Sequence, residues 1–195
     1  NRKTSNNKGV PMSENKLANP APLGLMGFGM TTVLLNIHNA GFFPMDVNIM
    51  AMGIFYGGLA QVIAGIMEFR KGNTFGTTAF TSFGFFWITL VFIIMKGGAD
   101  RAFMGWYLFM WGLLAFWLWF GTFNKHRAIQ VVFATVTALF WLLAVEHWFT
   151  VPAAFSTFTG IEGIITGLSA IYLAAAEVLN EDKGRTVLPI GMIKK

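Results

Sequence analysis

The sequence predicts an all-α integral membrane protein with six transmembrane helices and both termini in the cytoplasm. Three observations support this fold class. Apolar residues make up 55% of the 195-residue chain and charged residues only 12%, about half the charge of a soluble domain. Six apolar stretches approach the roughly 20 residues that a helix needs to cross a bilayer. The basic residues gather in alternate connectors, which indicates an orientation.

The apolar stretches predict helices because a backbone in lipid must satisfy its hydrogen bonds within the protein. Glycine, proline and asparagine occupy the short connectors between them, as turns require. The flanking segments 1–19 and 179–195 are polar, so we expect a disordered N-terminal tail and a cytoplasmic C-terminal tail around a six-helix domain at 20–178. The expected spans are 22–39, 47–69, 75–95, 102–122, 128–147 and 153–178.

The distribution of basic residues agrees with six spans. Twelve of the fourteen Lys and Arg residues lie in the two tails and in the second and fourth connectors. Lys96 and Arg101 occupy the third connector, and the first and fifth connectors hold none. Six spans place the twelve on one side, which the positive-inside rule assigns to the cytoplasm. With five or seven spans, these twelve basic residues would be divided between the two sides of the membrane.

Polar residues recur at helical spacing on one face of three spans. A side-chain amide or carboxyl that faced lipid would lack a partner, at a cost of several kcal/mol, so these faces are expected to point inward. Two interpretations remain open: hydrogen bonding and close packing between helices, or a pathway lined by hydroxyls and amides. The faces are Phe28, Thr32, Asn36 and Asn39; then Gly53, Gly57, Gln61, Gly65 and Glu68; then Thr159, Glu162, Thr166 and Ser169.

Among the acidic residues, Glu162 is expected to lie deepest in a span. An intramembrane acid is a functional candidate, so we consider a proton or substrate role for Glu162 beside a purely structural one. Glu68, Glu146 and Glu177 lie near span ends, where a solvated or ion-paired role is expected.

The composition also excludes several kinds of chemistry. The chain has no cysteine, and its three histidines lack the spacing of a metal site. No catalytic grouping and no phosphate-binding loop is found. We therefore expect no enzyme activity, no catalytic residues, no metal, no cofactor and no nucleic-acid partner.

One heptapeptide is specific. Residues 19–25 read NPAPLGL, which resembles the signature of the acetate uptake transporter family, the succinate–acetate permeases of bacteria and their yeast relatives. The resemblance runs from about residue 16 to residue 191 and is weakest at 96–102 and 148–165. It continues through MGFGMTTVLLNIHN at 26–39, AMGIFYGG at 51–58, GNTFGTTAFTS at 72–82 and SAIYLAAAEVLNEDKGRTVLPIG at 169–191.

The resemblance implies a hexameric ring of six-span subunits, similar in fold to the urea channels, with a pathway through each subunit. It also implies an apolar constriction, whose positions fall on Phe28, Phe83 and Val136. Relatives can carry Tyr at the second position and Leu at the third, so the width of this constriction is open. Residues 1–11 precede Met12, where relatives begin, and are expected to be dispensable.

Further pathway residues are expected in the matched segments. Proline suits the first turn of a helix, and the free N–H groups at a helix start favour an anion. Contact with substrate and structural framing of the first helix are equal alternatives for the heptapeptide. The candidate pathway residues are Asn19, Pro20, Pro22, Gly24, Thr32, Asn36, Tyr56 and Gln61.

The sequence thus favours transport of acetate and other small carboxylates, succinate among them, across the cell membrane, which would be the inner membrane in a Gram-negative cell. We expect proton linkage, because a bare carboxylate is costly in hydrocarbon. The expected partners are acetate, related carboxylates, the lipid bilayer and five further copies in a homo-hexamer. The alternatives are a passive channel for an anion or for a neutral solute such as urea or ammonia, and a membrane sensor or scaffold.

Overall fold

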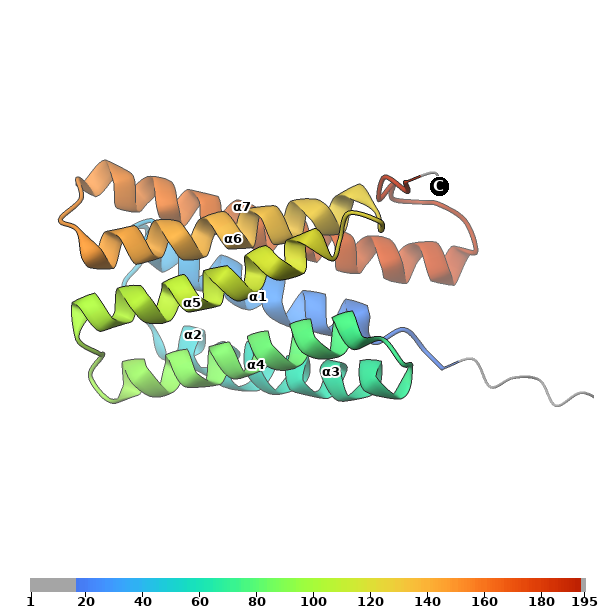
Figure 1. Ribbon diagram of the computed structural model, residues 1–195, viewed down its shortest axis with the longest axis horizontal. Coiled ribbons are helices and arrows are strands. Elements are labelled where there is room, and N and C mark those ends of the chain that lie inside the picture. Colours follow the sequence, from blue (N-terminus) through green and yellow to red (C-terminus); the bar gives the residue numbers. More distant parts are fainter. Residues whose placement is uncertain (1–16, 194–195) are drawn as a thin grey trace, which may run out of the picture.

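The computed structural model describes residues 17–193, so most of the predicted disordered tail lies outside the described residues. The described chain is a bundle of six helical rods (Figure 1). The second rod consists of three consecutive elements, α2, η1 and α3. The elements are α1 (Ala21–Asn39), α2 (Val47–Ile54), η1 (Phe55–Ala60), α3 (Gln61–Arg70), α4 (Thr74–Met95), α5 (Arg101–Phe120), α6 (Arg127–Trp148) and α7 (Ala153–Lys183).

The rods coincide with the six predicted spans to within a few residues. Five of them are long and apolar enough to cross a membrane, and α1 is the exception. The reason lies in its surroundings: α1 packs against α7, η1 and α3, so protein rather than lipid surrounds much of it. Its glycines and asparagines are tolerated there. The chain is a multi-pass membrane protein.

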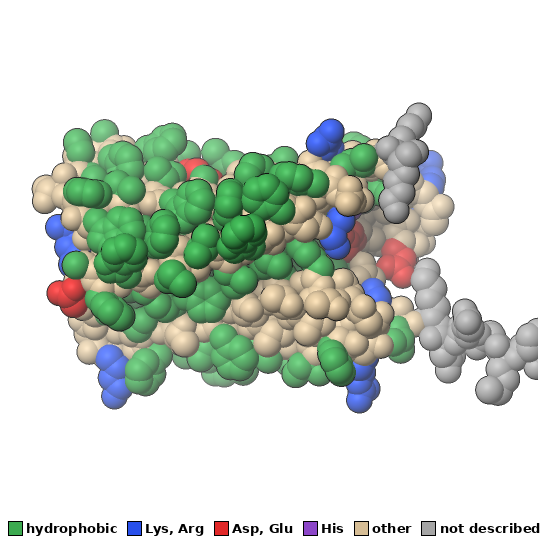
Figure 2. All heavy atoms as spheres, viewed as in Figure 1, with side chains coloured by type: hydrophobic (Ala, Val, Ile, Leu, Met, Phe, Trp, Pro, Cys, Tyr) green, Lys and Arg blue, Asp and Glu red, His purple; other side chains and the backbone are tan. Residues whose placement is uncertain are grey.

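Both ends of the described chain lie at the same end of the bundle, with the α3–α4 and α5–α6 connectors (Figure 1). Lys71, Lys125 and Arg127 belong to these connectors or follow them directly. Apolar side chains cover the middle of the visible face, and the basic side chains lie toward the two ends (Figure 2). The positive-inside rule makes the end with the termini the cytoplasmic end.

The second rod contains one π-helical turn, η1, in its middle. Such turns insert an extra residue into a helix and are frequent at functional sites. The turn brings a backbone carbonyl against α1: a Cβ atom at Gly27 would lie 2.6 Å from the Tyr56 carbonyl oxygen. The face predicted to point inward is buried on both sides of the π-helical turn. It consists of Gly53, Gly57, Gln61, Gly65 and Glu68, which are all buried.

Helices α1 and α7 pack against each other through glycines on both helices. A Cβ atom at Gly29 would lie 2.7 Å from the Gly167 carbonyl oxygen, and a Cβ atom at Gly167 would lie 2.7 Å from the Gly29 carbonyl oxygen. The two backbones therefore approach closely, as small residues permit in membranes. Thr159 and Thr166, which belong to the predicted polar face of α7, are fully buried. Packing between helices is the interpretation that fits this face.

The last helix continues to Lys183, beyond the predicted span end at 178, and stops at Gly184 with a φ of 60°. The following segment turns back onto the start of α6. Arg127 N donates to Gly191 O at 2.9 Å, and Ala128 N donates to Ile190 O at 3.0 Å. The described part of the C-terminal tail is therefore fixed beside the α5–α6 connector.

Candidate functional site: two cavities and an apolar neck

Two cavities lie inside the bundle, one toward each end. The cytoplasmic cavity has a volume of about 210 Å³ and the outer cavity about 200 Å³. Phe28 and Val136 line both cavities, and Phe83 lines the cytoplasmic one. The three predicted constriction residues thus lie together at the boundary between the cavities, which we call the neck.

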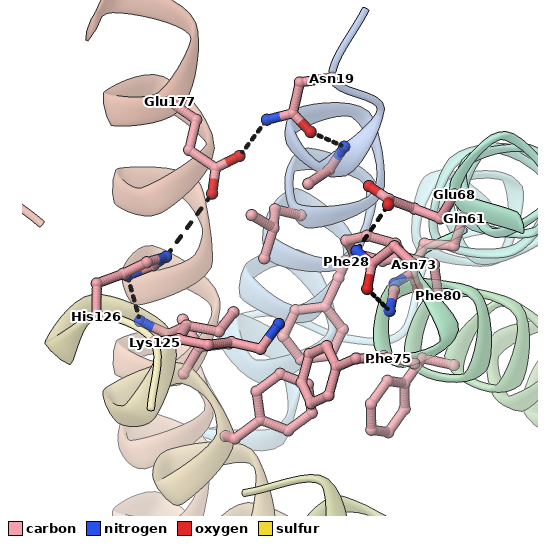
Figure 3. Close-up of a pocket in the computed structure, with 18 of the residues that line it drawn as sticks. Asn19, Phe28, Gln61, Glu68, Asn73, Phe75, Phe80, Lys125, His126 and Glu177 are labelled. Carbon is pink, nitrogen blue, oxygen red and sulfur yellow. Dashed lines mark hydrogen bonds and ion pairs between the residues drawn. The ribbon is translucent and has the colours of Figure 1, made fainter. Parts of the chain in front are cut away.

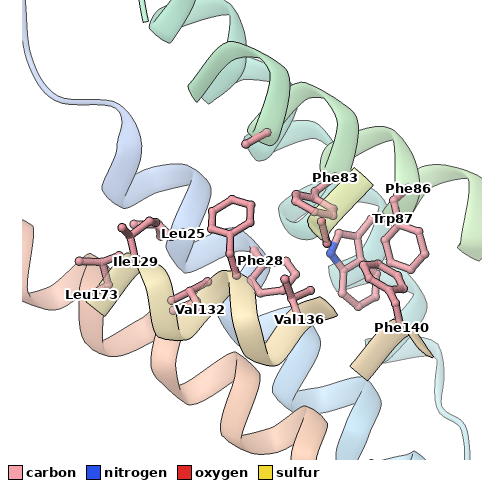
Figure 4. Close-up of a cluster of buried hydrophobic side chains, with 14 of the residues drawn as sticks. Leu25, Phe28, Phe83, Phe86, Trp87, Ile129, Val132, Val136, Phe140 and Leu173 are labelled. Atoms are coloured by element: carbon pink, nitrogen blue, oxygen red, sulfur yellow. The ribbon is translucent and has the colours of Figure 1, made fainter. Parts of the chain in front are cut away.

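Aromatic packing closes the neck. The ring centroids of Phe28 and Phe83 are 6.0 Å apart, and Phe83 stacks on Phe140 at 6.2 Å with an interplanar angle of 11°. Phe28, Phe83 and Val136 are 6%, 4% and 2% exposed. Figure 4 shows these side chains arriving from α1, α4 and α6. A bare carboxylate at this position would lose its water without gaining a polar partner from these three side chains, at a cost of several kcal/mol.

The mouth of the cytoplasmic cavity carries two carboxylates. Glu68 is 1% exposed and accepts a hydrogen bond from Asn73 Nδ2 at 2.7 Å. Glu177 accepts one from Asn19 Nδ2 at 2.8 Å, and its other oxygen lies 4.0 Å from His126 Nε2. Figure 3 shows these groups around one opening. Four different segments of the chain supply them.

Two lysines balance these acids. Lys71 Nζ donates to Asn19 Oδ1 at 3.2 Å, and Lys125 Nζ lies 4.1 Å from the centre of the Phe75 ring. Both lysines line the cavity. The mouth therefore combines two acidic and two basic side chains.

His126 lies in the α5–α6 connector and caps α6. Its Nδ1 accepts a hydrogen bond from Ile129 N at 3.2 Å, which places the proton of the neutral ring on Nε2, facing Glu177. Burial, and to a lesser extent the charge of Lys125, lower the pKa of His126 below its ordinary value. At neutral pH this histidine is therefore mostly an uncharged donor.

The outer cavity is lined by the polar face predicted for the first span. Thr32 Oγ1 donates to Phe28 O at 2.7 Å, and Asn36 Nδ2 donates to Thr32 O at 2.9 Å. Asn39 Nδ2 then donates to Asn36 Oδ1 at 3.0 Å. All of these residues line the cavity, so this face of α1 does point into an inner space.

Among the other candidate pathway residues, Asn19 and Gln61 line the cytoplasmic cavity. Pro20, Pro22, Gly24 and Tyr56 line neither cavity. Pro20 precedes α1 and Pro22 lies in its first turn, while Gly24 packs against the Phe80 ring. Tyr56 is half-buried in η1. These four residues lie in or beside the helices around the cavities, which agrees with structural framing for three of the heptapeptide residues.

Glu162, considered for a proton or substrate role beside a purely structural one, lies outside both cavities. It is half-buried on α7, and its Oε1 accepts a hydrogen bond from Thr166 Oγ1 at 3.1 Å. Its Oε2 is buried without a partner among the described residues. The helical spacing of Glu162 and Thr166 indicated an inward face; Thr166 is fully buried there, but neither residue lines either of the two cavities.

Sequence reasoning missed the groups at the cytoplasmic mouth. Glu68 and Glu177 were expected to be solvated or ion-paired, and no role was assigned to Asn73, Lys125 or His126. The predicted topology contained the information needed to group these residues. Residues in the second connector, in the fourth connector and at the end of the last span all meet at one end of the bundle.

Comparison with known proteins identifies the family. A sequence profile of the GPR1/FUN34/yaaH family matches residues 2–194. The chain belongs to this family. It is 57% identical over 186 residues to a protein of Escherichia coli K12 named succinate-acetate/proton symporter SatP, with 92% of this chain and 98% of that protein covered.

Two further members place the family among membrane transport proteins. A solved structure titled the bacterial acetate channel SatP superimposes with a TM-score of 0.88 at 56% identity, covering 90% of this chain and all of that one. A protein of Saccharomyces cerevisiae named ammonia transport outward protein 2 is 35% identical over 182 residues, 87% of this chain and 64% of that protein. These names confirm the predicted family and agree with the expectation that the chain is no enzyme.

Proposed function

We propose that this chain moves acetate and other small carboxylates, succinate included, across the cytoplasmic membrane in a proton-linked manner. The observation that carries the proposal is the pair of cavities that meet at the neck of Phe28, Phe83 and Val136. A cavity on each side with polar groups at its mouth, and an apolar barrier between them, form a pathway within one subunit.

The apolar neck is the reason for proton linkage. A carboxylate that enters the neck loses its hydration, whereas the neutral acid does not carry that charge penalty. The solute therefore crosses as the acid, or as an anion accompanied by a proton. Glu177 and His126 at the cytoplasmic mouth are groups that exchange a proton with a solute leaving the neck.

The names of the relatives support a carboxylate. The Escherichia coli relative is named a succinate-acetate/proton symporter, and the solved structure is titled an acetate channel. These two descriptions agree on acetate and differ on whether flux is coupled. The second candidate function is a passive channel for an anion or a neutral solute, favoured by the yeast relative that is named for ammonia transport.

Radiolabelled uptake into proteoliposomes separates the candidates. Purified protein is reconstituted, and acetate, succinate, urea and ammonium are offered with and without an inward proton gradient. We expect acetate uptake above that of empty liposomes, and accumulation only when the gradient is present. Fast uptake that only equilibrates would identify a channel. Uptake of urea or ammonium, with acetate at the level of empty liposomes, would overturn the carboxylate proposal.

We also propose assembly into a homo-hexamer in the cell membrane, the inner membrane in a Gram-negative cell. Large apolar side chains are exposed along α3 and α7, Ile63, Ile66, Ile165 and Leu168 among them, and either lipid or a neighbouring subunit would cover them. Native mass spectrometry of the detergent-solubilised protein counts the subunits directly. A mass of six chains is expected, and a monomer at all detergent concentrations would contradict it.

A further inference from the structure

A buried indole N–H group beside the neck has no hydrogen-bond partner. Trp87 is 2% exposed, and its Nε1 makes no hydrogen bond with any described residue. Buried donors are nearly always paired, because an unpaired one forfeits the bond it made with water. Trp87 lines the outer cavity, so its donor has access to a space that the protein does not fill.

The ring of Trp87 is held rigidly in this place. Trp87 follows Phe83 by four residues on α4, which puts it one turn further toward the outer side on the same face. A Cβ atom at Gly57 would lie 2.9 Å from Trp87 Cγ, and Phe86 packs edge-on at 5.6 Å. In Figure 4 the indole nitrogen lies on the side of the ring that faces Phe83 and Phe28. The donor is thus fixed next to the neck.

The chemistry of the group restricts its ligand. An indole N–H donates one hydrogen bond and accepts none, so it suits a carboxyl oxygen and cannot bind an ammonium ion. The other polar groups of this cavity are largely engaged within α1: Thr32 and Asn36 both donate to backbone carbonyls of that helix. Among the described residues that line this cavity, Trp87 thus offers a buried donor with no hydrogen bond at all.

A complementary group lies across the neck. Gln61 is 1% exposed and lines the cytoplasmic cavity, and its Oε1 has no partner among the described residues. A carboxylic acid offers an oxygen that accepts a hydrogen bond and an O–H that donates one. The free indole N–H and the free amide oxygen match these two groups.

We propose that Trp87 is a substrate-binding residue, whose indole N–H donates a hydrogen bond to a carboxyl oxygen of the solute at the outer side of the neck. Gln61 receives the same carboxyl group on the cytoplasmic side. This inference rests on the proposed function, since it assumes that the solute is a carboxylate or its acid.

The variant Trp87→Phe tests the proposal because it keeps an aromatic ring and removes the N–H. The matched control is Trp141→Phe: Trp141 Nε1 is also buried without a partner among the described residues, but Trp141 lines neither cavity. We expect the KM for acetate uptake to rise about tenfold in Trp87→Phe and to stay unchanged in Trp141→Phe. An unchanged KM in both variants would overturn the proposal.

A second measurement does not depend on transport. The indole N–H resonances of the seven tryptophans are followed by NMR in ¹⁵N-labelled protein during titration with acetate, and Trp87→Phe identifies the resonance of Trp87. We expect acetate to shift this resonance and to leave that of Trp141 in place. No shift at saturating acetate would overturn the role of Trp87. Absence of wild-type uptake would instead refute the proposed function, while this titration still decides whether the indole binds a carboxylate.

Discussion

At the scale of single residues, we expect the volume of Phe83 at the neck to control which solutes pass. Replacing Phe83 by Leu removes the ring that contacts Phe28 and Phe140 but keeps the site apolar. Discrimination by an apolar constriction of this kind amounts to about tenfold per group removed. We expect the ratio of succinate to acetate uptake to rise about tenfold in Phe83→Leu.

Phe92→Leu serves as the control for this substitution, because Phe92 lies on the same helix and is 60% exposed. It should leave the ratio of succinate to acetate uptake unchanged. Competition assays with both labelled solutes in proteoliposomes measure the ratio. An equal ratio in Phe83→Leu and in the wild type would mean that Phe83 does not limit the path.

The lowered pKa of His126 predicts a pH dependence of stability. The unfolded chain binds a proton at the ordinary histidine pKa, near 6.5, whereas burial and Lys125 hold the folded pKa below it. Between these two values the unfolded state binds more protons, so stability falls as the pH drops through about 6.5. We expect the His126→Gln variant to lose less stability than the wild type over this drop in pH.

Melting temperatures in detergent, measured from about pH 8 to pH 5, test the prediction for His126. His38→Gln is the control at the opposite end of the bundle and should keep the wild-type slope. A wild-type slope in His126→Gln would show that another group is responsible.

The three predicted constriction residues do lie together between the cavities, whereas the grouping at the cytoplasmic mouth was not predicted. Phe28, Phe83 and Val136 were found through a family resemblance, because aromatic and branched side chains in an apolar chain carry no signal of their own. Glu68 shows the limit of reasoning by position: it lies at the end of a span, where solvent was expected, yet Asn73 and the start of α4 bury it.

At the scale of elements, the close approach of α1 and α7 holds the bundle together. A side chain at Gly167 would collide with the backbone of Gly29, and overpacking of this kind costs about 1–3 kcal/mol. We expect Gly167→Val to lower the melting temperature in detergent, and the neighbouring Leu168→Val, whose side chain is 52% exposed, to have little effect. Equal melting temperatures for the two variants would contradict the close packing.

Asn180 makes three of the hydrogen bonds that hold the segment after α7. Asn180 accepts hydrogen bonds from Val187 N and Leu188 N and donates one to Leu188 O. Asn180→Ala should therefore release residues 185–193, seen as faster amide hydrogen exchange and faster proteolysis there. Asp182→Ala, which removes an exposed ion pair with Lys183, should leave exchange unchanged. Unaltered protection in Asn180→Ala would show that other contacts hold the segment.

Helix ends and spans were largely predictable because hydropathy and breaker residues determine them. The π-helical turn at Phe55–Ala60 was not, since a glycine-rich stretch such as residues 57 and 58 is compatible with either helix type. The fixed C-terminal segment was also missed. Its polar composition indicated solvent, whereas Asn180 and the start of α6 provide partners for its backbone.

At the scale of the whole molecule, the absence of cysteine allows a clean test of orientation. Asp46 precedes α2 at the outer end, and Asp182 lies near the end of α7. In intact cells, a membrane-impermeant maleimide should label Asp46→Cys, and it should label Asp182→Cys only after permeabilisation. The reverse pattern would invert the assigned topology.

The measurement that tests the central claim most directly is reversible block of the path. Asn39→Cys places one thiol in the outer cavity, and Asn48→Cys places one on the exposed surface near the start of α2. Acetate uptake into proteoliposomes is measured before and after treatment with a small charged methanethiosulfonate, then after reduction. If acetate passes through the cavities and the neck, the reagent abolishes uptake in Asn39→Cys, reduction restores it, and Asn48→Cys is unaffected. Full uptake by the modified Asn39→Cys protein would show that acetate crosses elsewhere.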